Sequence, residues 1–377
     1  MQDAVNQTSS AAKRPSLSQF IADHIWTGVP TEPGAGKIGV EQSQALYLMR
    51  GFAILIVVIV HITEWPTRFA FFCMPLFFFV SGYLFVPPKA LPGYFLNLTR
   101  KLMIPYFVFM AIIAAPNVTR LFLEGGAAAG FDRIGHLLVG GEQIRGIWAA
   151  YWYIPCFFFM HIAYTLSARV LSPGAITLLC IPLWGLAIWN HYAADFWLPL
   201  AINVVAMAFP LMHAGWLYRN REFSQDFDRT FHIGAAIIGG AYTIPAAFYL
   251  VPGLDTKFAE YGVPVVTVFC AILMVIATKV LADRLREVHI LNLTLGEIGK
   301  ASLIIMFAHQ AIQMSIVSVF DIYFAPLRIV VSVGLSYALF RWLRSSRIGG
   351  AIFLGKPLRL PKADTARRSS KPANALS

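Results

Sequence analysis

The chain has 377 residues, of which 58% are hydrophobic and only 13% are charged, and its mean hydropathy is +0.64. A soluble domain carries about 25% charged residues, so this composition excludes a protein that is surrounded by water. The formal net charge of +11 does not indicate a nucleic-acid-binding protein, because most of the excess lies in short connections and in a basic C-terminal stretch. Topology and anionic membrane lipids explain that charge more simply.

The apolar residues fall in blocks of roughly 18 to 22, the length that a helix needs to cross ~30 Å of hydrocarbon. The sequence therefore predicts an all-α fold, a polytopic membrane helix bundle of about ten transmembrane helices. These helices are expected at residues 46–63, 70–87, 102–123, 148–168, 174–190, 196–218, 230–250, 262–282, 299–320 and 323–343.

The polar segments divide the chain into three parts. Residues 1–45 mix Ser, Thr, Pro, Gly and Gln without the apolar run of a signal peptide, which predicts a disordered cytoplasmic tail. Residues 46–345 form the predicted transmembrane domain, and residues 346–377 a basic cytoplasmic tail. The longest exterior connection, 124–147, is rich in Gly and suits either a lid over a binding site or a plain linker.

Lys and Arg residues predict the orientation. With the N-terminus inside, 24 of them fall in the inner segments and six in the outer segments. This imbalance satisfies the positive-inside rule and favours an even number of spans with both termini in the cytoplasm. The outer residues are Arg68, Arg120, Arg133, Arg145, Lys257 and Arg328.

The four cysteines all fall inside predicted spans, and none of them has the spacing of a metal site. They are Cys73, Cys156, Cys180 and Cys270. Buried free cysteine behaves as a small apolar residue, so we expect packing residues, with no disulfide framework and no metal.

Ionisable groups at membrane depth are costly and therefore candidates for function. Arg50 and His61 are eleven positions apart, which places them 20° apart on one helix face and roughly 16 Å apart along the axis. Glu64 follows on the same face, so a cation, a deep imidazole and a carboxylate share one stripe. The simpler alternative is a basic anchor, a packing histidine and an interfacial carboxylate.

A second polar stripe lies in the ninth predicted span. Ser302, His309 and Gln313 fall within about 40° of one another, so they are able to face the same cavity as the first stripe. His161 and His213 also lie in spans, but neither has an evident partner at helical spacing, which favours structural roles.

The first two spans resemble acyltransferase family 3. Residues 48–61, LMRGFAILIVVIVH, are similar to the family's first helix, in which an Arg is followed by ten residues and a His. Residues 71–85, FFCMPLFFFVSGYLF, resemble its second helix, commonly FHMPLFFFLSGYLF. Cys73 replaces the usual His, so any role of that His is absent or relocated.

Three later segments extend the resemblance. Residues 100–106, RKLMIPY, are similar to the basic entry of the third helix, although Leu98 stands where an earlier arginine is common. Residues 151–155, YWYIP, resemble the fourth helix, and 299–303, GKASL, followed by His309, resemble a late segment. Within the family, the chain looks most like the branch related to fucose 4-O-acetylase.

The resemblance implies an O-acyltransferase that moves an acyl group, usually acetyl from acetyl-CoA, to a hydroxyl of a cell-surface glycan or lipid-linked sugar. It also implies the bacterial cytoplasmic (inner) membrane. The acceptor glycan, the length of the acyl group and the oligomeric state stay open.

The site residues follow from the resemblance and from the two stripes. His61 is expected to act as general base or to take the acyl group transiently, and Arg50 and Glu64 to assist it. Arg50, Arg100 and Lys101 are the expected partners of the coenzyme A phosphates. The residues expected to line the cavity are Ser81, Tyr83, Trp152, Ser302 and His309.

Two alternatives remain. Ser81 either hydrogen-bonds the developing oxyanion or, beside Gly82, forms a helix-packing contact. For the whole chain, a secondary transporter or glycan flippase would also need ten spans and polar residues at the midplane. No repeat or inverted symmetry is visible in the sequence, which weighs against a carrier.

Overall fold

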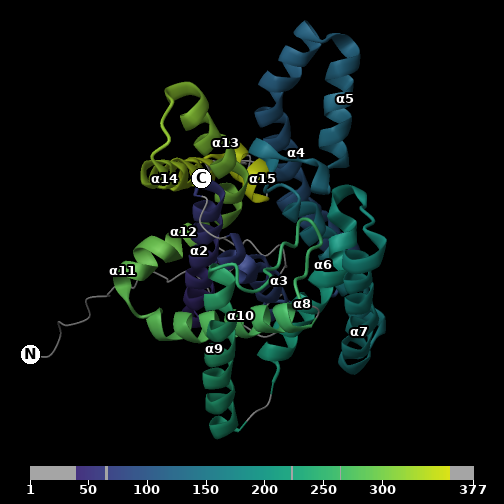
Figure 1. Ribbon diagram of the computed structural model, residues 1–377, viewed down its shortest axis with the longest axis vertical. Helices are drawn as coiled ribbons and strands as arrows, with labels where there is room; N and C mark the ends of the chain where they lie inside the picture. The colour runs from purple at the N-terminus through teal and green to yellow at the C-terminus, as the bar shows by residue number, and fades with distance from the viewer. Residues whose placement is uncertain (1–39, 64–66, 222–223, 264, 357–377) are drawn as a thin grey trace, which may run out of the picture.

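The computed structural model describes residues 40–63, 67–221, 224–263 and 265–356 (Figure 1). Over these residues the chain is helical, and its β pairing is limited to one isolated bridge between Asp255 and Glu260. The predicted all-α membrane bundle is confirmed. The long helices are α2 (Val40–Ile62), α3 (Cys73–Tyr83), α4 (Leu91–Glu124), α5 (Gly126–Val139), α6 (Tyr153–Val170), α7 (Pro173–Trp189), α8 (Val205–Arg219), α9 (Gln225–Ala247), α10 (Val266–Leu285), α13 (Ser302–Phe320) and α14 (Ala325–Ser345).

Short elements connect the long helices. Four 3₁₀ segments lie before α3, α6 or α8, and one π-helical turn lies on each side of the α8–α10 region. These elements are η1 (Thr67–Phe72), η2 (Gly141–Gln143), η3 (Gly146–Trp148), η4 (Asn190–Ala194), η5 (Pro199–Val204), α11 (His289–Leu291), η6 (Asn292–Gly296), α12 (Glu297–Lys300) and α15 (Arg347–Leu354).

Helix α2 defines two ends of the bundle, which we name the Arg50 end, where α2 begins, and the His61 end, where it finishes. Helix α4 runs in the same direction as α2. Its Lys101 meets Gly355 next to the end of α14, whereas its Phe109 stacks on Phe307, farther along α13. The chain between two parallel helices must return across the bundle, so η1 and α3 together cross it.

Helix α9 also crosses the bundle. Helix α8 finishes at the Arg50 end, where Arg219 donates a hydrogen bond to the carbonyl of Tyr83, the last residue of α3. The stretch after α9 lies at the other end, because Arg68 of η1 donates to the carbonyls of Tyr249 and Val251. Helix α9 therefore runs from the Arg50 end to the His61 end.

In the part of the chain that the structure describes, eight helices are long and apolar enough to span a membrane by length and composition alone. Helices α3 and α9 are not among the eight, yet they also cross the bundle, so all ten predicted spans have a counterpart that does. The first span begins earlier than expected, at Val40, and the predicted C-terminal tail contains α15, which packs on α4 and α14.

Pairs of glycines bring the helices that carry the sequence motifs into backbone contact. A Cβ atom on Gly51 would overlap the carbonyl of Leu295, and one on Gly299 would overlap the carbonyl of Tyr47. The absence of side chains at these two positions lets α2 lie directly on η6 and α12. Gly82 of α3 and Gly215 of α8 approach each other's helices in the same way.

The expected exterior loop 124–147 is mostly helix. Helix α5 packs against the second half of α4, and this hairpin projects from the bundle at the top of Figure 1. The chain then turns back into the bundle, where Gly140 meets Tyr106 and the short segments η2 and η3 follow. Gly140, Gly141 and Gly146 all have positive φ angles, which a glycine adopts without strain.

Candidate functional site

Arg50 is held between α2 and α13 at the Arg50 end. Its side chain is only 2% exposed, and Nη2 donates a hydrogen bond of 2.8 Å to Oγ of Ser302, which is also buried. The guanidinium lies 5.8 Å from the ring centre of Tyr47, one helical turn earlier. The two predicted stripes therefore face each other. Because Arg50 is buried, its guanidinium links α2 to α13 through the hydrogen bond to Ser302 and is not exposed to solvent.

His61 and His309 form the second contact between the stripes. Nδ1 of His61 and Nε2 of His309 are 2.9 Å apart, and the rings lie nearly parallel at an angle of 18°. Both contacts follow the same order along α2 and α13, so the two helices run parallel. The sequence placed these residues on two helical stripes, and the pairing of the two stripes comes from the structure.

The hydrogen bonds define the tautomers of both rings. Nδ1 of His309 lies 2.7 Å from the carbonyl oxygen of Ile305, which only accepts, so this nitrogen carries the proton. In a neutral ring Nε2 of His309 is then an acceptor, and Nδ1 of His61 must donate to it. The remaining nitrogen of His61, Nε2, consequently has a lone pair and is able to take a proton or attack an acyl carbon.

His61 lies one residue before the end of α2, and its side chain is partly exposed, whereas His309 is fully buried. The predicted span ended at residue 63 and α2 ends at Ile62, so the imidazole lies in the last turn of the helix, while the helix begins six residues earlier than expected. Glu64, the predicted third member of the stripe, lies outside the described residues.

Polar side chains continue from His309 towards the His61 end of α13. Gln313, one turn after His309, is buried; it donates to Gln310 and accepts a hydrogen bond from Arg328 of α14. Gln310 and Arg328 were not among the predicted site residues. They extend the polar contacts from the Ser302 pair to the start of α14.

The charges at the Arg50 end form a network around α12. Glu297 accepts from Lys300 at 2.5 Å and from the hydroxyl of Tyr337 at 2.9 Å. Glu297 lies outside the membrane-spanning segments, and Lys300, which donates a hydrogen bond to it and attracts its charge, lowers its pKa in spite of partial burial. Arg341 completes the network through a bond of 3.4 Å to the Tyr337 hydroxyl.

Arg100 and Lys101 lie at the same end as Arg50 but on α4. Arg100 is exposed, and Lys101 is partly buried against Gly355 at the end of α15. The contact of Lys101 with Gly355 does not bring either residue next to Arg50. The expected phosphate partners therefore share one end of the bundle without forming a single cluster, and the two on α4 are the ones with exposed surface.

The other predicted cavity residues have separate surroundings. The hydroxyl of Ser81 donates to the carbonyl of Phe78 in its own helix at 2.7 Å, which fits the packing alternative. The ammonium of Lys279 lies 5.4 Å from the ring centre of Tyr83. Trp152 is buried and packs edge-on against Tyr153. These three side chains line different parts of the bundle.

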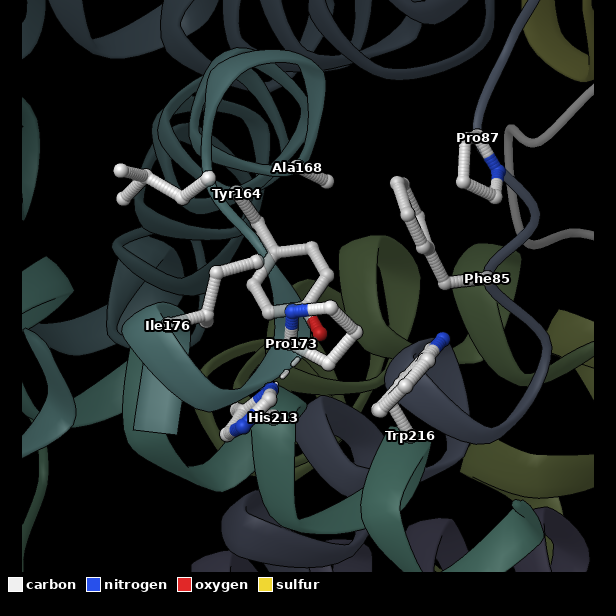
Figure 2. Close-up of a pocket in the computed structure, with 9 residues that line it drawn as sticks. Phe85, Pro87, Tyr164, Ala168, Pro173, Ile176, His213 and Trp216 are labelled. Carbon is white, nitrogen blue, oxygen red and sulfur yellow. Dashed lines mark hydrogen bonds between the residues drawn. The ribbon is translucent and has the colours of Figure 1, made fainter. Parts of the chain in front are cut away.

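The two other buried histidines pair with tyrosines from neighbouring helices. His161 contacts the hydroxyl of Tyr94 at 3.1 Å. His213 bonds the hydroxyls of Tyr164 at 2.9 Å and Thr177 at 2.8 Å, and it lines a small hollow at the Arg50 end together with Phe85 and Trp216. Figure 2 shows His213 and Trp216 on one side of this hollow. The sequence did not predict the hollow.

The cysteines are all free, with Cys73, Cys156 and Cys270 buried and Cys180 partly buried. Cys73 stands at the start of α3, where it is fully enclosed. Within the described ranges, the His, Cys, Asp and Glu side chains form no group of three that would hold a metal ion. The described side chains of the two stripes carry imidazole, guanidinium, hydroxyl and amide groups.

Comparison with known proteins agrees with this arrangement. No curated protein and no solved structure matches the chain. The family model described as the acyltransferase domain matches residues 44–341, which include both stripes and nearly the whole helix bundle. With Arg50 and His61 on one helix and their partners Ser302 and His309 on another, the chain belongs to acyltransferase family 3 and is an integral membrane acyltransferase.

Proposed function

We propose that this protein is an O-acyltransferase that moves an acyl group, acetyl in the first instance, from acyl-CoA to a hydroxyl of a cell-surface glycan or lipid-linked sugar. The hydrogen bond between His61 and His309 carries the proposal, because it leaves Nε2 of His61 unprotonated and pointing away from its partner. A sugar hydroxyl is a poor nucleophile at neutral pH and needs such a base.

The reaction step assigns one proton to His61. The acceptor hydroxyl gives its proton to Nε2 of His61 while its oxygen bonds to the carbonyl carbon of the thioester. The carbon–sulfur bond then breaks, and the coenzyme A thiolate takes the proton from His61 as it leaves. Through this cycle His309 stays hydrogen-bonded to Nδ1 of His61 and stabilises the imidazolium that forms transiently.

The donor is proposed to enter at the Arg50 end. Arg100 is exposed there and Lys101 partly so, and cations of this kind suit the phosphates of coenzyme A. Arg50, which is buried, is proposed to fix the spacing of α2 and α13 through Ser302 and thereby position the donor path. Eleven residues separate Arg50 from His61, a rise of ~16 Å, which is comparable to the length of a pantetheine arm.

The acceptor is proposed to arrive at the His61 end. In the orientation that the basic residues predict, this end faces the outside of a bacterial inner membrane and the Arg50 end faces the cytoplasm. The enzyme then joins a cytoplasmic donor to an acceptor on the other side. The acetyl group and the branch related to fucose 4-O-acetylase belong to this proposal and rest on the sequence motifs.

The experiment uses purified protein in detergent with radiolabelled acetyl-CoA and a mixed glycan extract. Wild type is compared with His61→Ala and, as a control for loss of an imidazole elsewhere in the bundle, with His161→Phe, which changes a fully buried histidine. Label in glycan from the wild type and the control, but not from His61→Ala, is the expected result. Transfer by His61→Ala at the wild-type rate would contradict the assignment, and binding of coenzyme A without any transfer would point to another acyl donor or acceptor.

A further inference from the structure

Two connecting segments, 144–151 and 251–263, contact each other at the His61 end of the bundle. In the first, Gly146 lies against the side chain of Met314, and Tyr151 donates to the carbonyl of Phe307 at 3.2 Å. Met314 and Phe307 stand five residues after and two residues before His309 on α13. The segment from 144 to 151 therefore passes along the part of α13 that holds His309.

The second segment connects α9 to α10 and presents Lys257. Asp255 and Glu260 pair across a tight turn, and the backbone N–H of Lys257 donates to Oδ1 of Asp255 at 3.0 Å. Nζ of Lys257 then donates to the carbonyl of Ile144 at 2.6 Å. This bond joins the two segments at the His61 end, and Lys257 lies within electrostatic range of His61.

The surroundings of Lys257 suit a ligand that is polar and carries apolar faces. The ammonium lies 5.1 Å from the ring centre of Phe258, and the guanidinium of Arg145 lies 5.7 Å from the same ring. Among the described residues, Asp255 and Glu142 are the acidic groups near enough to attract the charge of Lys257, and Arg145 is the cation that repels it. Partial burial is the main cause that lowers the pKa of Lys257 to about 8.

An ammonium has three N–H donors. Among the bonds between described residues, Ile144 accepts one of them from Lys257, and two donors remain for a ligand. A hydroxyl that reacts at Nε2 of His61 belongs, in a sugar, to a ring whose adjacent carbon also bears an oxygen. A cation at the His61 end would donate a hydrogen bond to that neighbouring oxygen.

We infer that Lys257 is an acceptor-binding residue, whose ammonium holds the oxygen adjacent to the reacting hydroxyl of a sugar acceptor at the His61 end of the bundle. The inference rests on the proposed function and adds to it the residue that orients the acceptor. It also gives the segment 251–263 a specific role, since this segment delivers Lys257 to the site.

The test measures transfer of radiolabelled acetyl from acetyl-CoA to the glycan extract, with the extract and acetyl-CoA varied separately. Lys257→Met is expected to raise the extract concentration at half-maximal rate by about tenfold or more, the value of one hydrogen bond to a charged group. The KM for acetyl-CoA should stay within twofold of wild type. Lys257→Arg, which keeps the charge, should recover most of the loss, and Arg120→Met on the exposed α4–α5 hairpin serves as the control on the same face.

The outcomes separate the inference from the proposed function. Transfer by the wild type together with unchanged acceptor dependence in Lys257→Met would overturn the inference alone. A rise in both half-saturation values, or no recovery in Lys257→Arg, would assign Lys257 a structural role and would also overturn it. No transfer by the wild type, with intact binding of coenzyme A, would overturn the proposed function and the inference with it.

Discussion

Replacing His309 with phenylalanine tests whether this residue sets the tautomer of His61. Phenylalanine keeps a planar ring but provides no acceptor for the Nδ1 proton of His61. The lost hydrogen bond has a net value of about 0.5–1.5 kcal/mol, which changes the ratio of the two tautomers by roughly 2- to 13-fold. Loss of ring orientation adds to this effect, so we expect kcat to fall about 10- to 100-fold.

The stability of the fold should change little in His309→Phe. The carbonyl of Ile305 is four residues before His309 in α13, so it still accepts the helical backbone hydrogen bond when the imidazole is removed. Glutamine at position 309 should retain more activity than phenylalanine, because its amide oxygen is able to accept from Nδ1 of His61. The His161→Phe variant controls for the loss of a buried imidazole.

The measurement is the transfer rate at saturating acetyl-CoA for His309→Phe, His61→Ala and the double variant. Loss of the general base itself costs about 10²- to 10⁴-fold, so His61→Ala should be the slower single variant. Because His309 acts only through His61, the double variant should be no slower than His61→Ala. Additive losses, or a wild-type rate in His309→Phe, would refute the role of His309 as the residue that positions His61.

Three further predictions follow from the contacts. Ser302→Ala removes the hydroxyl that accepts from the buried Arg50 and should lower the free energy of unfolding by about 1–3 kcal/mol, measured by thermal unfolding in detergent; an unchanged midpoint would contradict this role. Gly299→Ala should cost about 1–3 kcal/mol because its methyl group overlaps a backbone carbonyl of α2, while Gly234→Ala, which meets open space, should cost nothing comparable. The pKa of Lys257 is lowered to about 8, so the wild type should bind the acceptor more weakly as the pH rises through 8 and Lys257 loses its charge. Lys257→Arg keeps its charge at this pH and should not show this weakening. The same weakening in both proteins would assign it to another group.

Much of the fold is determined by composition and by the positions of apolar blocks. Each predicted span has a helix that crosses the bundle, because a backbone surrounded by hydrocarbon must satisfy its hydrogen bonds within the helix. The blocks at 70–87 and 230–250 were predicted correctly even though α3 and α9 are not among the helices that qualify by length and composition. The helical segment α5 was missed, since a Gly-rich stretch between two spans is typical of a loop.

The sequence also determined which helix faces carry the candidate site residues. The interval of eleven residues placed Arg50 and His61 on one stripe of α2, and helical spacing placed Ser302 and His309 on one stripe of α13. Such periodicity reports the direction of a side chain around its own helix and contains no information about its neighbours.

Only the tertiary structure decided that the two stripes meet. Gly51 and Gly299 let α2 and α12 touch, and this approach brings Arg50 to Ser302 and His61 to His309 across about 250 positions of sequence. The same packing encloses Arg50, fixes the proton on Nδ1 of His61 and joins Lys257 to the segment that lies along α13. These properties depend on distances between helices, which arise from packing of the whole bundle and not from the pattern within any one segment.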